Sequence, residues 1–220
     1  TPWARVCYGV DTGGPDVRVV RAERTGRRLN WKTVPFDQDV LAEAVANGAA
    51  VAGGMPVGQG LAAWVRAPFS SVSKALRVFP TLIDIQLPFP LEDCRYAFTE
   101  ALRLRPDEIP FSVGGGARAI SSAEATASDT VGVSALAMVA RTADVEARLK
   151  ALATDGIDPH VLDYEGVALW TQGLREHPVA DRAGAPLRVV VFMRRNGGVM
   201  VIGRGRHFWR AHRIQAGDPK

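Results

Sequence analysis

Residues 5–34, RVCYGVDTGGPDVRVVRAERTGRRLNWKTV, decide the fold that the sequence predicts. β-Branched and aromatic residues are frequent in 5–11, 16–23 and 29–34, and glycines and a Pro-Asp pair separate these three runs. Runs of this length with turn-forming residues between them are typical of neighbouring antiparallel strands. We therefore predict a three-stranded antiparallel meander at the start of the chain.

The end of the chain has the same layout. Strand-like runs occupy 187–192, 198–203 and 206–212, with glycines at both turns. Trp209 falls in the third run of this copy, as Trp31 does in the first copy. Two copies of one pattern predict a duplicated three-stranded unit.

Helix-like and strand-like runs alternate between the two meanders. Asp37 and Gly48 have the positions of an N-cap and a stop signal around a predicted helix at 37–48, and Gly156 follows a second predicted helix at 142–154. Further predictions are strands at 131–140 and 157–162, a helix at 165–174 and a Gly-rich connecting loop at 112–128.

Composition limits the classes of function. Of the 220 residues, 47% are hydrophobic, so the chain can bury a core. A net charge of +4 is too small an excess to indicate nucleic-acid binding. Cys7 and Cys94 lie in apolar surroundings and predict reduced, buried thiols, and the histidines lack metal-ligand spacing. The spacing of the histidines therefore predicts no metal site. No run is apolar enough for a membrane helix, so we expect a soluble protein.

The first turn carries a candidate phosphate loop, formed by Asp11, Thr12, Gly13 and Gly14. Backbone N–H groups in a tight glycine turn can approach an anion while a carboxylate holds Mg²⁺ through water. The same residues are also typical of an ordinary hairpin turn. Both interpretations stay open at this point.

Asp163 and Glu165 lie at a predicted strand-to-helix junction. A carboxylate there can cap the helix or lie near a phosphate or metal. Neither a Gly-x-Ser-x-Gly motif nor a lysine after Gly114–Gly116 is present, so we expect no catalytic residues.

A proline-rich apolar run is the candidate partner-binding segment, with the residues Leu87, Pro88, Phe89, Pro90 and Leu91. The two prolines exclude an ordinary helix and reduce the entropy lost on docking. Phe89 can then be an exposed apolar anchor for a partner, or it can fill the core between lobes. The sequence leaves both roles open.

Three stretches resemble the type IV pilus assembly protein M family and the related cytoplasmic domain of type II secretion protein L, which belong to the actin-like ATPase superfamily. They are the opening YGVDTGG at 8–14, the run QLPFPLED at 86–93, and 137–169 with LDYEGVAL at 162–169. The sequence departs from nucleotide-binding members at Phe192-Met193-Arg194, where those members have Asp-x-Gly. A bound ATP with Mg²⁺ is therefore not expected.

The resemblance implies an α/β fold, actin-like (ribonuclease H-like), with duplicated three-stranded meanders and helices. It implies a first lobe with an inserted subdomain at 1–130 and a second lobe, incomplete at its C-terminal end, at 131–220. The implied function is a non-catalytic cytoplasmic assembly platform of a type IV pilus or type II secretion machine, peripheral to the bacterial inner membrane.

The implied partners are the cytoplasmic tail of an inner-membrane pilus or secretion protein, held at 87–91, and the assembly ATPase. A homodimer is a further option, and nucleic acid is not expected. The alternative function is a nucleotide-binding actin-like ATPase with Asp11 in its Mg²⁺ site.

Overall fold

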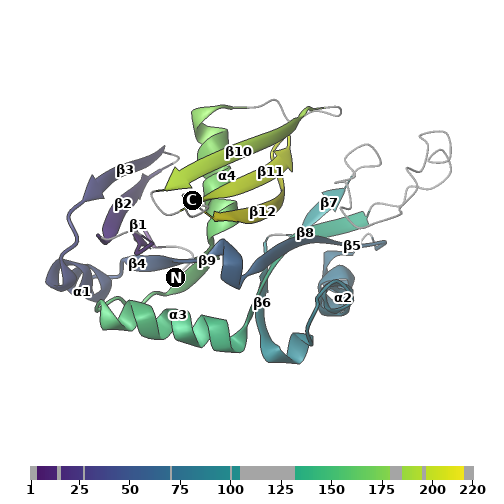
Figure 1. The fold of residues 1–220 in the computed structure, drawn as a ribbon, viewed down its shortest axis with the longest axis horizontal. Coiled ribbons are helices and arrows are strands. Elements are labelled where there is room, and N and C mark those ends of the chain that lie inside the picture. Colours follow the sequence, from purple (N-terminus) through teal and green to yellow (C-terminus); the bar gives the residue numbers. More distant parts are fainter. Residues whose placement is uncertain are drawn as a thin grey trace, which may run out of the picture. The chain divides into compact units, whose positions relative to one another are not determined.

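A computed structural model describes residues 4–13, 16–26, 28–69, 71–99, 101–104, 132–178, 185–194 and 197–215 (Figure 1). The predicted loop at 112–128 lies outside these residues. The chain forms two compact units, which are Thr1–Pro56 with Ala143–Glu165, and Val57–Thr142 with Gly166–Lys220. The two units are defined by the contacts within each of them. The division into lobes at 1–130 and 131–220 stays a prediction.

The first unit is built on a mixed sheet in the order β3-β2-β1-β4-β9. β1 pairs antiparallel with β2, and β2 with β3, so the predicted opening meander is confirmed. β4 runs parallel to β1, and β9 runs parallel to β4. The strand bounds are Val6–Asp11 for β1, Arg18–Thr25 for β2, Arg28–Val34 for β3, Ala50–Met55 for β4 and Val161–Tyr164 for β9.

Two helices of the first unit begin and end where local signals predict. The Asp37 carboxylate accepts hydrogen bonds from the backbone N–H groups of Asp39 and Val40 at 3.0 and 3.1 Å, which caps α1 (Gln38–Ala46). Gly48 has a φ of 86°, and Gly156 has a φ of 70° just beyond α3 (Thr142–Thr154). Glycine takes up this left-handed conformation at little cost, and it ends both helices.

The core of the first unit joins the sheet to both helices. Tyr8 and Val10 of β1 pack with Val51 of β4, Leu41 of α1 and Leu152 of α3. The predicted strand at 157–162 is corrected, because β9 begins only at Val161. Ile157 instead closes the end of α3, where its N–H donates to the Leu152 carbonyl at 2.9 Å and its side chain is buried.

A second sheet is inserted between β4 and α3. Its order is β5-β8-β6, with β7 also paired to β8, and α2 packs against it through fully buried Phe79 and Ile83. The sequence predicted only β8 of these elements, at 131–140. The elements are η1 (Val57–Gln59), β5 (Leu61–Ala67), α2 (Val72–Asp84), η2 (Leu91–Asp93), β6 (Cys94–Phe98), β7 (Leu102–Leu104) and β8 (Gly132–Arg141).

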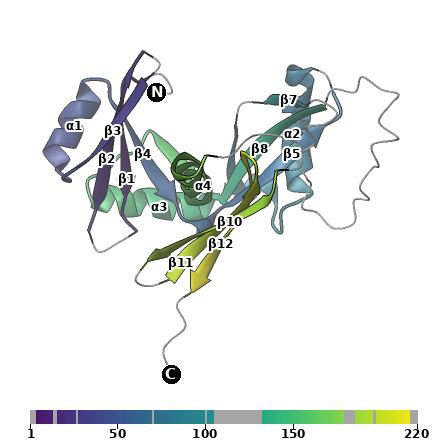
Figure 2. The same ribbon diagram turned by 90° about the horizontal axis from the view of Figure 1, so that it is seen from above.

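The second predicted meander is also confirmed. β10 (Leu187–Arg194), β11 (Gly197–Arg204) and β12 (His207–Gln215) form an antiparallel sheet in chain order. α4 (Glu165–Glu176) lies beside this sheet in both ribbon views (Figures 1 and 2). Gly173 of α4 faces Val190 of β10, because a Cβ built at this glycine would lie at an ordinary contact distance of 3.5 Å from the valine side chain.

Candidate functional site

The candidate phosphate loop forms a tight turn at the end of β1. The Gly13 N–H donates to the Asp11 carboxylate at 2.9 Å, which is the hydrogen bond of an Asx turn. The N–H group that could face an anion is therefore directed at the protein's own carboxylate. Thr12 is half-buried beside it, and Gly14 lies outside the described residues. This geometry favours the ordinary turn over a phosphate cradle.

The corresponding turn of the second meander offers no carboxylate. Phe192 and Met193 pair with Val199 and Gly198 of β11, and Met193 is 69% exposed. The chain from 187 to 215 contains neither Asp nor Glu. In the part of the chain that the structure describes, no group of three metal-ligating side chains comes together.

Asp163 and Tyr164, at the end of β9, have raised pKa values. Burial raises the pKa of the Asp163 carboxyl, although the hydrogen bond from the Tyr164 N–H at 2.8 Å opposes this shift. Burial, with a smaller effect from Glu165, raises the pKa of the Tyr164 phenol to about 12. The Asp163 carboxylate thus accepts a hydrogen bond from the backbone N–H of Tyr164, the residue before the first residue of α4. This local structural role is close to the helix capping predicted for Asp163.

The candidate partner-binding segment alternates between packed and exposed residues. Leu87, Phe89 and Leu91 pack against the core of the inserted sheet, whereas Pro88 and Pro90 are exposed. The alternation follows from the extended geometry that the prolines impose. The segment therefore offers a stiff proline surface, with its apolar side chains already partly used within the protein.

Phe89 is held by a cation above its ring. The Arg141 guanidinium carbon lies 4.6 Å from the ring centroid. Such a pair contributes roughly 0.5–1 kcal/mol at a partly exposed site. The turn is fixed further by the Leu91 N–H, which donates to the Asp84 carboxylate at 3.1 Å, and by Cys94, whose thiol donates to the Pro90 carbonyl at 3.4 Å. Two roles were predicted for Phe89, an exposed anchor and a residue that fills the core. This geometry fits the second role, with Phe89 packed against the core of the inserted sheet.

The two cysteines are free, as expected from the sequence. Cys94 is buried, but Cys7 is only half-buried, so the prediction of two buried thiols is corrected in part. Burial raises the pKa of both thiols, which disfavours the reactive thiolate at neutral pH.

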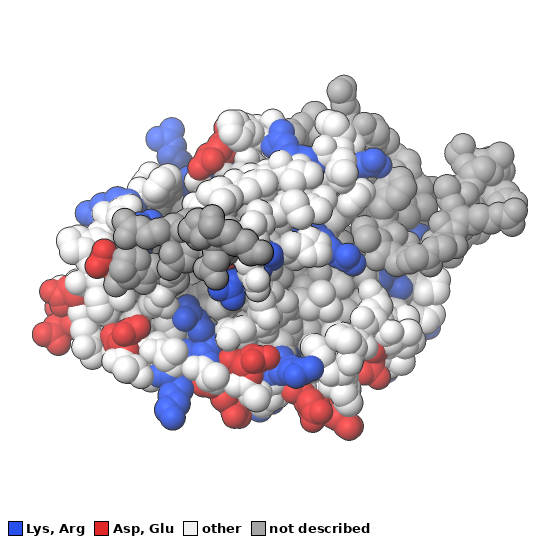
Figure 3. Space-filling view, viewed as in Figure 1, with Lys and Arg blue, Asp and Glu red and all other residues white. Residues whose placement is uncertain are grey.

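Charged side chains of both signs are interspersed on the face seen in Figure 3. This distribution differs from the single basic face that nucleic-acid binding favours. None of the helices among the described residues is long and apolar enough to span a membrane.

Sequence reasoning did not identify an exposed apolar row on β10. Leu187, Val189, Val191 and Met193 are between 49% and 69% exposed and alternate along the strand. The available signal was the run from Val189 to Met193, in which the residues of both strand faces are apolar. Such a run is typical of a strand that is covered on both faces.

No protein-family model matches the chain, and no curated protein matches it. Among solved structures, the chain is similar to the PilM-PilN type IV pilus biogenesis complex, with a TM-score of 0.52 and 15% identity over 96% of this chain. The chain spans 61% of the length of that protein.

Two further solved structures show weaker similarity. One is the cytoplasmic domain of EpsL, an inner membrane component of the type II secretion system of Vibrio cholerae, with a TM-score of 0.42 and 11% identity over 96% of this chain and 70% of that one. The other is a Bacteroides thetaiotaomicron protein with an actin-like ATPase fold, with a TM-score of 0.37 and 6% identity over 97% and 71%. These two scores add nothing to the fold assignment. The order β3-β2-β1-β4-β9 and the likeness to the PilM-PilN structure show that this chain has the predicted actin-like (ribonuclease H-like) α/β fold.

Proposed function

We propose that this chain is a non-catalytic assembly platform of a type IV pilus or type II secretion machine, on the cytoplasmic side of the bacterial inner membrane. The likeness to the PilM-PilN type IV pilus biogenesis complex carries the proposal, since it extends over 96% of the chain. The YGVDTGG, QLPFPLED and LDYEGVAL stretches support the same assignment from the sequence.

The platform acts by binding and makes or breaks no bond. Support comes from the two turns in which a nucleotide-binding relative would hold Mg²⁺ and phosphate. In the first turn, the Gly13 N–H donates to the Asp11 carboxylate of the same turn. The second turn has Phe192-Met193-Arg194 where a carboxylate would be needed. The assembly ATPase of the machine would supply the chemical energy, and this chain would contact it.

The cytoplasmic tail of an inner-membrane partner would bind on the segment from Leu87 to Leu91. Pro88 and Pro90 are the exposed residues of this segment, and their rings are already ordered before the tail binds. Preorganised apolar surface of this kind binds with little loss of conformational entropy. A tail segment with aliphatic side chains would pack on the two rings.

The test measures the affinity of a synthetic peptide that copies the cytoplasmic tail of the inner-membrane pilus or secretion protein of the same organism. The change P88E/P90E puts charges on the exposed surface and leaves the packed residues Leu87, Phe89 and Leu91 in place. We expect binding at least about tenfold weaker. The matched control is Pro35→Glu, an exposed proline between β3 and α1 in the first unit. Equal affinities of P88E/P90E and the control would refute this docking site.

The alternative function, a nucleotide-binding ATPase, makes a separate prediction. A ligand that binds only the folded state raises the melting temperature. We expect no rise with millimolar Mg-ATP. A rise of several degrees that Asp11→Ala abolishes would favour the nucleotide-binding function over the platform.

A further inference from the structure

The hairpin of β2 and β3 contains most of the excess positive charge of the chain. Between Val17 and Phe36 the sequence has six basic residues and one acidic residue, so this stretch has a charge of +5. The whole chain has a net charge of +4, so all the other residues together are close to neutral. The six basic residues are Arg18, Arg21, Arg24, Arg27, Arg28 and Lys32.

The acidic residue of this hairpin is already paired within the first unit. The Glu23 carboxylate lies 3.2 Å from the Arg5 guanidinium and 3.0 Å from the Arg21 guanidinium. From residue 24 to residue 34 the sequence has no Asp or Glu. Among the residues that the structure describes, no ion pair occupies Arg28 or Lys32. Both cations are therefore available to an anionic partner.

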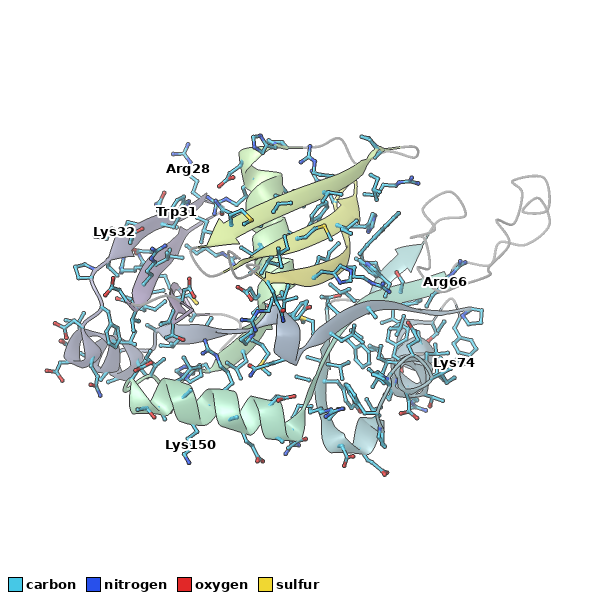
Figure 4. All side chains as sticks on the ribbon, viewed as in Figure 1. Arg28, Trp31, Lys32, Arg66, Lys74 and Lys150 are labelled. Atoms are coloured by element: carbon cyan, nitrogen blue, oxygen red, sulfur yellow. The ribbon has the colours of Figure 1, made fainter. Side chains whose placement is uncertain are left out.

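β3 exposes side chains on both of its faces. All six residues from Arg28 to Thr33 are exposed, and Val34 is the residue of β3 that packs against the core of the first unit. Figure 4 shows Arg28, Trp31 and Lys32 in order along the strand. β3 is also the outermost strand in the order β3-β2-β1-β4-β9. Side chains from both faces can therefore reach one flat surface that lies against the strand.

Protection of the sheet edge explains only part of this pattern. Charged side chains on an edge strand discourage pairing with another strand, which accounts for Arg28 and Lys32. It does not account for Leu29 and Trp31, which are 60% and 49% exposed between these cations. Tryptophan and leucine beside basic side chains are typical of segments that lie at a membrane surface.

The chemistry of the hairpin fits a bilayer that contains anionic lipids. Guanidinium and ammonium groups can bind lipid phosphates while their aliphatic stems lie along apolar surface. An indole ring is favoured at the level of the headgroups. Single-stranded nucleic acid also attracts cations, but it favours several aromatic rings on which successive bases stack. Trp31 is the one aromatic residue in the sequences of β2 and β3, and Leu29 offers no such ring.

We propose that the β2–β3 hairpin binds the surface of a bilayer with anionic lipids. Arg28 and Lys32 would contact lipid phosphates, and Leu29 and Trp31 would enter the headgroup layer. The placement of this bilayer at the inner membrane rests on the proposed function, whereas the binding surface rests on the hairpin. A lipid contact of this kind strengthens the attachment of the platform beyond that of the partner tail alone.

The test measures flotation of the whole chain with vesicles of phosphatidylglycerol and phosphatidylcholine, compared with vesicles of phosphatidylcholine alone. We expect binding to the anionic vesicles that weakens with salt. R28Q/K32Q should bind at least about tenfold more weakly, because each cation near an anionic surface contributes roughly a fivefold factor. L29T/W31T retains good strand formers and removes apolar surface, and it should bind at least about fivefold more weakly.

The matched control removes the same charge elsewhere. K74Q/K150Q changes exposed lysines of α2 and α3, which Figure 4 also labels, and should leave vesicle binding nearly unchanged. Urea unfolding verifies that all the variants are folded. Equal losses of binding in K74Q/K150Q and R28Q/K32Q would show attraction by net charge alone and would overturn the proposal.

Tryptophan fluorescence reports contact with the lipid directly. Brominated acyl chains quench an indole ring that enters the bilayer, and the chain has five tryptophans. We expect quenching in the unchanged protein and much less in W31F, which retains a ring at the same position and should still bind. Undiminished quenching in W31F would overturn the assignment of β3 as the lipid contact.

Failure of this proposal can be distinguished from failure of the tail-binding site at 87–91. R28Q/K32Q should bind the tail peptide as tightly as the unchanged chain does, so absent vesicle binding would overturn the lipid site alone. Without vesicle binding, binding of a single-stranded oligonucleotide that R28Q/K32Q abolishes would assign the hairpin to nucleic acid. Self-association that L29T/W31T abolishes, again without vesicle binding, would assign it to a second copy of this chain. Either result would overturn the proposal.

Discussion

Trp170 of α4 holds the helix on the second meander, and its removal should destabilise the second unit strongly. The side chain is 2% exposed, and the indole N–H donates to the Arg206 carbonyl at 3.0 Å. Replacement of a buried tryptophan by alanine removes both packing and this hydrogen bond, which costs about 3–5 kcal/mol. Total stabilities are typically about 5–15 kcal/mol, so Trp170→Ala removes a large share.

A milder substitution separates the two contributions. Trp170→Phe keeps most of the buried ring but leaves the Arg206 carbonyl without its donor, and the expected loss is about 1–3 kcal/mol. The assay is urea unfolding followed by circular dichroism, with the free energy of unfolding extrapolated to water. Ala168→Ser, an exposed change on the same helix, is the control and should cost about 0.5 kcal/mol. A Trp170→Ala protein as stable as this control would refute the packing of α4 on the meander.

Three further predictions concern the first unit. Asp37→Ala removes the cap of α1 and should cost about 1 kcal/mol in urea unfolding, whereas Asp37→Asn should retain most of the stability. Gly156→Ala places a side chain at a φ of 70° and against Gln38, so a loss of about 1 kcal/mol or more is expected by the same measurement. Burial raises the pKa of the Asp163 carboxyl, so the contribution of this group to stability is complete below the ordinary aspartate pKa and is lost as pH rises through the folded-state pKa. Asp163→Asn should therefore stabilise the protein at neutral pH, and the gain should disappear in acid. A gain in stability that does not depend on pH would contradict this reasoning.

Local signals predicted the elements that have strong ends. The sequence predicted both meanders, α1 and α3, because each has a glycine turn or a capping residue at its ends. The Asp37 cap and the left-handed Gly156 appear in the structure as expected. Periodicity alone was a weaker guide to burial. In α3, Leu149 and Leu152 are three residues apart and thus close to one face of the helix, yet Leu149 is 38% exposed whereas Leu152 is fully buried in the core of the first unit.

The missed elements lack such ends or depend on distant partners. β4, with the sequence AVAGGM, has two glycines and small side chains, which are poor strand formers in isolation. It is a strand because it lies between β1 and β9, whose residues are far from it in sequence. α2 was missed because Pro80 lies inside it and the proline-rich run follows; buried Ala75, Phe79 and Ile83 stabilise it from the sheet side.

The same dependence on distant residues explains why the candidate sites were only partly predictable. A motif such as LPFPL specifies an extended segment, but the exposure of each side chain is decided by the sheet beneath it and by Arg141, which comes from the far end of the insert.

The connection from the insert back to the first unit has no loop. β8 ends at Arg141 and α3 begins at Thr142, so the strand that carries the cation over Phe89 continues directly into the helix. Along α3, the Arg148 guanidinium donates to the Gly54 carbonyl of β4 at 2.8 Å. Arg141 is the last residue of β8 and also the cation over Phe89, so a change at Arg141 acts on this ring from outside the segment at 87–91.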